Sequence, residues 1–334
     1  MNPFDPLFFL IIVVVLAWTY DFFNGMNDAA NAIATTVSTK ALTPRQAIAL
    51  ARTMNILGAF LTTEVAKTMG KGVIDPGSMD QLILIASLIG ASGWSALCTY
   101  MGIPISITHA LVGGIIGSAI ISKGITVLKF AGVKKIIIAM LLSPIAGFFF
   151  GFLLMILIFW LFRKALPAKI NKGFRYGQIL SAAFMSFTHG SNDTQNAMGV
   201  ITAALLVSGF IETFSVPIWV ILGSALFMGL GTSVGGWKVI KTMGMKMVKL
   251  KPVHGFTAEF SSAGIILISS LLGAPISTSH VISTSIMGVG ATQRLSAVRW
   301  GIAVHIILTW ILTFPGAALI SALAYLLLRV IFYS

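Results

Sequence analysis

The sequence predicts an all-α protein that crosses a membrane many times and consists of two inverted-topology repeats of about five passages each. Three observations lead to this prediction. Hydrophobic residues make up 57% of the 334-residue chain and charged residues only 9%, against about 25% in soluble domains. Two polar motifs each occur once in either half of the chain. Loops at matching places in the two halves differ in charge, as expected when they lie on opposite sides of a membrane.

Long uncharged runs define the membrane passages, because a helix needs about 20 apolar residues to cross the hydrocarbon. In chain order, we expect the first half to form helices over 7–36, 46–66, 82–100, 104–122 and 136–162. We expect the second half to form helices over 177–207, 214–235, 257–272, 276–290 and 300–328. The first helix of each half contains a glycine, Gly25 or Gly190, and we expect each helix to be broken there.

Three sequence matches recur in the same order in both halves. The pattern G-x-N-D-x-x-N-A occupies 25–32 and 190–197, Lys-Thr-Met-Gly occupies 67–70 and 241–244, and G-x-P-I-S-x-[ST]-H occupies 102–109 and 273–280. Internal repeats of this kind are typical of transporters. They predict a first repeat over 1–165, a basic cytoplasmic linker over 166–175, and a second, inverted repeat over 176–334.

Loop charges predict how the repeats are oriented. Residues 67–80 contain two basic and two acidic side chains, whereas the matching residues 238–251 contain five lysines and no acid. Loops of unlike charge favour opposite sides, and five passages per half invert the second repeat and place both termini outside. The segments flanking each G-x-P-I-S can also form re-entrant hairpins, which return to the same side and leave this parity unchanged.

The net charge of +13 reflects basic residues in short loops between apolar runs, a pattern of membrane proteins rather than of nucleic-acid binders. We therefore expect a multi-pass protein of the plasma membrane that contacts lipid and binds no nucleic acid. An association of two copies as a homodimer stays open.

The N-D-x-x-N segments are candidates for a cation site. An ionisable group at membrane depth costs at least about 2.5–3.5 kcal/mol and normally has a function or a partner. Carboxylate and amide oxygens suit hard cations such as Na⁺, and asparagines at i and i+4 share a helix face. The candidate ligands are Asn27, Asp28, Asn31, Asn192, Asp193 and Asn196. The alternative is that these residues form interhelical hydrogen bonds.

The G-x-P-I-S-x-[ST]-H segments are candidates for an anion site. Proline favours a fresh helix start, and the first-turn N–H groups of a helix attract phosphate or sulfate. The candidate residues are Ser106, Ile107, Thr108, His109, Ser277, Thr278, Ser279 and His280. His109 and His280 can instead be packed structural residues. No Walker-type lysine loop is present, so nucleotide hydrolysis is not indicated.

Together these motifs resemble the inorganic phosphate transporter (PiT) family over nearly the whole chain. G-x-N-D-x-x-N-A resembles its G-A-N-D-V-A-N-A signature, the P-I-S segments resemble its P-[IV]-S-x-T-H segments, and 255–259 resembles its S-G-F-T-x-E stretch. The resemblance implies a sodium/phosphate symporter or an H⁺-coupled relative. It also implies a coupling role for Glu259, whereas Asn55 stands where a second glutamate of animal members is expected.

The resulting hypothesis is secondary import of inorganic phosphate by cation symport through alternating access, with Na⁺ as the co-transported ion and no bound cofactor. An H⁺-coupled phosphate or sulfate permease of the same fold is the nearest alternative. A membrane enzyme acting on a lipid phosphate is disfavoured, because no nucleophile–base pair with family-like spacing is present, so we expect the protein not to be an enzyme.

Overall fold

The computed structural model describes residues 6–74 and 78–333. The first half contains α1 (Pro6–Ser38), α2 (Pro44–Gly58), α3 (Glu64–Lys71), α4 (Gln81–Met101), α5 (Ile107–Lys123) and α6 (Phe130–Leu161). The second half contains α7 (Pro167–Val207), α8 (Ile218–Val234), α9 (Trp237–Lys241) with a following π-helical turn (Thr242–Lys246), α10 (Pro252–Leu271), α11 (Thr278–Ala291) and α12 (Trp300–Tyr333). The prediction of an all-α fold is confirmed, and the same order of elements recurs in the two halves.

The prediction that α1 and α7 are broken at their motif glycines was wrong, because both helices run through these positions. The glycines instead allow close helix crossings. A Cβ atom at Gly25 would lie 2.1 Å from the carbonyl oxygen of Met228 on α8, and one at Gly190 would lie 2.1 Å from that of Asn55 on α2. Each N-D-x-x-N segment therefore lies directly beside a tight contact between backbones.

The helix breaks lie at the G-x-P-I-S segments. Gly102 and Gly273 adopt left-handed φ angles of +75° and +64°, a region that glycine enters at little cost. A proline follows two residues later, and the next helix starts at the serine. Ser106 accepts a hydrogen bond from the His109 N–H (3.1 Å), and Ser277 accepts one from the His280 N–H (3.2 Å). Both serines are thus N-caps.

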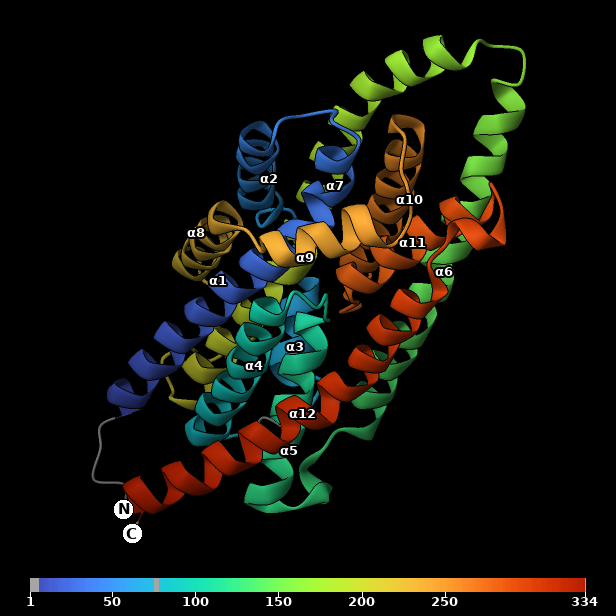
Figure 1. The fold of residues 1–334 in the computed structure, drawn as a ribbon. Coiled ribbons are helices and arrows are strands. Elements are labelled where there is room, and N and C mark those ends of the chain that lie inside the picture. The colour runs from blue at the N-terminus through green and yellow to red at the C-terminus, as the bar shows by residue number, and fades with distance from the viewer. Residues whose placement is uncertain (1–5, 75–77, 334) are drawn as a thin grey trace.

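Figure 1 shows how these breaks shape the molecule. The α4–α5 pair occupies the lower part of the view and the α10–α11 pair the upper part, so the two G-x-P-I-S turns point toward the middle. The long helix α6 runs down the right side of the view, and α12 crosses the front from the lower left to the upper right. The start of α1 lies beside the end of α12, where the Phe9 and Phe332 ring centroids are 5.2 Å apart.

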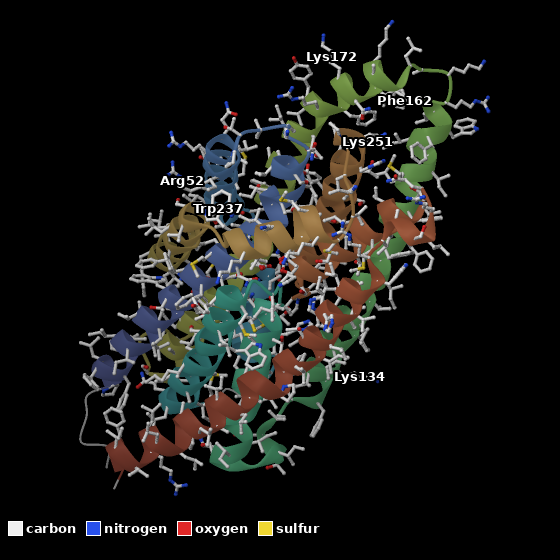
Figure 2. All side chains as sticks on the ribbon, in the orientation of Figure 1. Arg52, Lys134, Phe162, Lys172, Trp237 and Lys251 are labelled. Carbon is white, nitrogen blue, oxygen red and sulfur yellow. The ribbon has the colours of Figure 1, made fainter. Side chains whose placement is uncertain are left out.

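Four helices of the described chain (α1, α4, α6 and α12) are long and apolar enough to cross a membrane, and α8 with its continuation, bent by 63°, adds a fifth candidate. Residues 167–175 of the predicted linker form the first turns of α7. Figure 2 shows Lys172, Lys251 and Arg52 toward the upper end of the molecule, while Lys134 lies lower on α6.

The apolar core is divided where the polar motifs lie. One cluster of buried apolar residues includes α1 up to Tyr20 and α7 from Ala197, together with α4 and α5. The other includes α1 from Ala30 and α7 at Met185, together with α10 and α11. Since α1 and α7 pass from one cluster to the other in opposite directions, both N-D-x-x-N segments lie at the boundary between the two.

Candidate functional site

The carboxylates of the two repeats meet where α1 and α7 pack together. Asp28 and Asp193 are each 1% exposed. The imidazole of His189 lies between them, with Nε2 3.6 Å from Asp28 Oδ2 and 3.4 Å from Asp193 Oδ2. Ligand atoms of these three residues all lie within 4.8 Å of one another. The repeated acids predicted from the sequence therefore form one buried cluster rather than two separate sites.

Hydroxyl groups from the start of α11 contact both carboxylates. Thr278 Oγ1 donates to Asp193 Oδ2 (2.9 Å) and also lies 3.4 Å from Asp28 Oδ2. Ser279 Oγ lies 2.8 Å from Asp28 Oδ1. Because a hydroxyl has one hydrogen to donate, Thr278 can serve only one carboxylate at a time.

The second asparagine of each motif connects the two halves. Asn31 on α1 donates to Ser279 Oγ of α11 (2.9 Å), and Asn196 on α7 donates to Thr108 Oγ1 of α5 (3.0 Å). Each N-D-x-x-N segment thus binds the G-x-P-I-S segment of the other half. A change in the relative position of the two halves would have to break or exchange these bonds.

The first asparagine of each motif instead binds within its own half. Asn27 donates to Thr99 on α4 (2.7 Å), and Asn192 donates to Ser270 on α10 (3.1 Å). Both partners lie near the end of the helix that precedes the G-x-P-I-S turn. These bonds hold each motif against the nearer hairpin of its own repeat.

His189 is a site residue that the sequence reasoning missed. Its Nδ1 lies 3.0 Å from Asn55 Oδ1, while Asn55 Nδ2 donates to Thr232 Oγ1 (3.0 Å). With the amide oriented in this way, Nδ1 carries a hydrogen and Nε2 faces the carboxylates. The available signal was spacing, since His189 and Asp193 stand at i and i+4 on one helix. The search for repeated residues passed over it, because Asn24 occupies the matching position in the first half.

Glu259 and Asn55, the coupling candidates, lie in different places. Asn55 reaches the carboxylate cluster through His189. Glu259 on α10 is fully buried and accepts from Thr36 (2.7 Å) and Gln178 (3.3 Å). Further hydrogen bonds to the same carboxylate come from Thr35 and Ser181. Glu259 therefore has its own shell of hydroxyl and amide groups.

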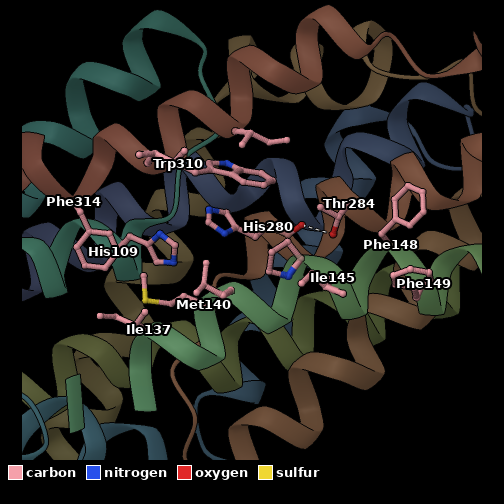
Figure 3. A pocket seen from close by; sticks show the side chains of 14 residues that line it. His109, Ile137, Met140, Ile145, Phe148, Phe149, His280, Thr284, Trp310 and Phe314 are labelled. Atoms are coloured by element: carbon pink, nitrogen blue, oxygen red, sulfur yellow. Dashed lines mark hydrogen bonds between the residues drawn. The ribbon is translucent and has the colours of Figure 1, made fainter. Parts of the chain in front are cut away.

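The histidine side chains of the P-I-S motifs line an apolar pocket and are not part of the carboxylate cluster. His109 and His280 pack edge to face, with ring centroids 4.4 Å apart, and His280 stacks on Trp310 at 3.7 Å. Figure 3 shows them in a pocket of about 590 Å³ lined mainly by apolar side chains of α6 and α12.

The other predicted anion-binding residues have different roles. Ser106 and Ser277 serve as helix N-caps, and the Ile107 carbonyl accepts a hydrogen bond from the Tyr20 hydroxyl (3.2 Å). Of the predicted anion-binding groups, the hydroxyls of Thr108, Thr278 and Ser279 therefore lie nearest the central cluster.

The centre contains several polar atoms that lack a hydrogen-bond partner among the described residues. These atoms are Asn27 Oδ1, Asn192 Oδ1, Asn196 Oδ1, Asp193 Oδ1 and His189 Nε2. A buried polar atom left unpaired costs about 1–3 kcal/mol. Four of the five are oxygens with no donor, and carboxylate and amide oxygens are what hard cations bind. The donor set fits a cation better than it fits a purely structural polar network.

Comparisons with known proteins identify the family to which the chain belongs. Two relatives are described as probable low-affinity inorganic phosphate transporters. One, from Bacillus subtilis (strain 168), is 46% identical over 98% of this chain and 99% of its own length. The other, from Rhizobium meliloti (strain 1021), is 41% identical over 95% of each chain. A solved structure described as the sodium-dependent phosphate transporter superimposes with a TM-score of 0.90 at 28% identity, covering 97% of this chain and 99% of that one. The model of the phosphate transporter family matches residues 24–321, and the chain therefore belongs to this family of multi-pass membrane transporters.

Proposed function

We propose that the protein imports inorganic phosphate together with Na⁺ by alternating access. The observation that supports this most directly is the set of donor-free oxygens around Asp28 and Asp193, located beside the hydroxyls of Thr278 and Ser279. The cation ligands would come from both N-D-x-x-N segments. The anion would bind at the adjoining hydroxyls at the starts of α5 and α11.

Adjacent sites of opposite charge explain the coupling. Two buried carboxylates without a cation would repel an incoming phosphate, whereas bound Na⁺ would attract it. Since coupling between two ligands is reciprocal, phosphate would in turn strengthen Na⁺ binding. The solved sodium-dependent phosphate transporter of the same fold supports Na⁺ as the coupling ion.

The inverted topology forms part of this proposal. The α4–α5 and α10–α11 pairs lie in opposite parts of the view in Figure 1, as expected for two hairpins that enter from opposite faces. Each G-x-P-I-S turn would then reach the centre from its own side, which suits a site exposed alternately to the two solutions. By the positive-inside rule, the end with Lys172 and Lys251 would face the cytoplasm and both termini would lie outside.

Binding measurements on single variants test the assignment. Asp28→Asn and Asp193→Asn remove one charge each and keep the side-chain shape. We expect each to weaken Na⁺ binding about tenfold or more, the loss expected for a contact to a charged group. Phosphate affinity should then fall to that of the unmutated protein without Na⁺. If both variants keep the original dependence of phosphate binding on Na⁺ concentration, the cation assignment is wrong.

Coupling to H⁺ is the second candidate, and His189 is the observation that favours it. A proton on Nε2 would place a positive charge 3.6 Å and 3.4 Å from the two carboxylates, where Na⁺ would otherwise act. Uptake into proteoliposomes with separately imposed Na⁺ and pH gradients distinguishes the two. Under Na⁺ coupling, His189→Gln still responds to a Na⁺ gradient. Under H⁺ coupling, phosphate uptake by the unmutated protein does not depend on the Na⁺ gradient, and uptake by His189→Gln no longer responds to the pH gradient.

A further inference from the structure

Asp21 is a buried carboxylate on α1 that the central site does not use. It is 0% exposed, and neither of its oxygens accepts a well-aligned hydrogen bond from the described residues, although the Ser224 hydroxyl lies nearby. No ion pair to it is found in the described part of the chain either, and an isolated carboxylate inside a membrane protein normally has a function. In its ionised form it therefore requires a counter-ion, and the side chains in the described part of the chain do not provide one.

The surroundings of Asp21 are rich in oxygen. Ser224 on α8 is 0% exposed, and its hydroxyl lies near the Asp21 carboxylate without a well-aligned hydrogen bond to any described residue. Asn24 is one helical turn further along α1, is also 0% exposed, and its Oδ1 lacks a donor in the described structure. Two carboxylate oxygens, one hydroxyl and one amide oxygen thus lie on or against one face of α1.

Tight helix packing encloses this group of side chains. A Cβ atom at Gly223 of α8 would lie 2.3 Å from the Trp18 ring, and one at Gly25 would lie 2.1 Å from the Met228 carbonyl oxygen. These contacts bracket Asp21 along the interface between α1 and α8. The close approach of the two helices leaves no room beside Asp21 for a long lysine or arginine side chain.

We propose that Asp21, Asn24 and Ser224 form a second Na⁺ site between α1 and α8, an inference that rests on the proposed Na⁺ coupling. Hard cations bind this combination of carboxylate, amide and hydroxyl oxygens. Charge balance gives the physical reason. Asp21 lies within electrostatic reach of Asp193, so a dianionic phosphate would enter a region with three carboxylates, and a second Na⁺ offsets part of that repulsion.

The proposed site is present in only one of the two repeats. The matching position in α7 is Ser186, which donates to its own helix at the Ala182 carbonyl oxygen (2.7 Å). No carboxylate therefore stands at the corresponding place against α2. This difference also supplies a matched control, since Ser186→Ala removes a hydroxyl at the equivalent position without touching the proposed site.

The experiment is equilibrium binding of ²²Na⁺ to the purified, phosphate-free protein and four variants. Asp21→Asn should bind one Na⁺ fewer per protein than the unmutated chain. Ser224→Ala should keep the stoichiometry but weaken one class of site about tenfold, the effect of one hydrogen-bond-sized contact. Ser186→Ala should match the unmutated protein. Asp28→Asn reports separately on the central site.

Two results would overturn the inference. The first is an unchanged number of bound Na⁺ ions in Asp21→Asn while Asp28→Asn loses one, which would leave the central site standing. The second is a complete absence of Na⁺ binding to the unmutated chain, which would remove the proposed coupling as well. If Asp21→Asn does not fold, Ser224→Ala decides, because unaltered Na⁺ affinity at every site in that variant contradicts the proposal.

Discussion

At the scale of single residues, equivalent positions in the two repeats have different partners. Asp28 and Asp193 both receive hydroxyl contacts from α11, through Ser279 and Thr278. Thr108 on α5, which corresponds to Ser279, binds the amide of Asn196 instead. The second P-I-S segment therefore donates to both carboxylates, whereas the first is joined to the N-D-x-x-N segment of the other half through the bond between Thr108 and Asn196.

This asymmetry predicts unequal effects of the same Thr→Val substitution at Thr278 and at Thr108, two positions that differ by one residue within their motifs. Thr278→Val removes a hydroxyl that donates to a carboxylate, whereas Thr108→Val removes one that accepts from a neutral amide. Because hydrogen bonds to charged groups are about twice as strong, Thr278→Val should weaken Na⁺-dependent phosphate binding about tenfold and Thr108→Val less. Isothermal titration of both proteins with phosphate at fixed Na⁺ measures this. Equal losses would show that the asymmetry does not matter for binding.

The capping serines lead to a different expectation. Ser277→Ala should lower the free energy of unfolding by about 0.5–2 kcal/mol, because it removes the acceptor for the His280 N–H, while Ser277→Gly should cost only a few tenths. Thermal unfolding in detergent provides the measurement, and Ser106 gives an independent second pair. If alanine and glycine are equally harmless to stability while phosphate affinity falls, the hydroxyl contacts the anion rather than capping the helix.

At the scale of helices, the motif glycines determine how closely α1 and α7 approach their neighbours. Gly25 packs against α8 and Gly190 against α2 at backbone carbonyl groups, which cannot move aside as a flexible side chain can. The same contacts bring Asn55 to His189. A glycine expected to break a helix is thus required for helix packing.

Alanine at either glycine should separate the helices. We expect Gly25→Ala and Gly190→Ala each to destabilise the protein by about 1–3 kcal/mol or more, as overpacking does. Gly264→Ala in α10 is the control, because a Cβ there meets nothing within 4 Å, and alanine in a helix is favoured by about 0.5–1 kcal/mol. Unfolding midpoints of the three variants measure the effect, and a Gly25→Ala protein as stable as Gly264→Ala would refute the packing argument.

At the scale of the whole molecule, the two halves are linked by exchanged contacts. Asn31 binds the second hairpin and Asn196 the first, so the centre of the protein is also the interface between the repeats. Under the proposed alternating access, a movement that opens the site to one side would act directly on these bonds and would tie ligand binding to the relative position of the halves.

The proposed inverted topology makes a prediction at this scale. Single cysteines at Ser78 and Lys246, in a Cys98→Ala background, should react with a membrane-impermeant thiol reagent from opposite sides of intact vesicles. Lys246 is exposed and Ser78 is partly exposed, so both are accessible to reagent. Labelling of both positions from the same side would contradict the inverted arrangement.

The sequence by itself determined the fold class, the repeated order of elements and the family, because apolar runs and repeated motifs are local properties of the chain. It also singled out Asp28 and Asp193 as candidates, since acids in apolar segments are conspicuous. Only the tertiary structure decided that the two acids share one cluster with His189, that Gly25 and Gly190 serve packing, and that His109 and His280 face an apolar pocket. These features depend on contacts between helices distant in sequence, and the direction in which a side chain points at a helix crossing is set by its neighbours rather than by its own segment.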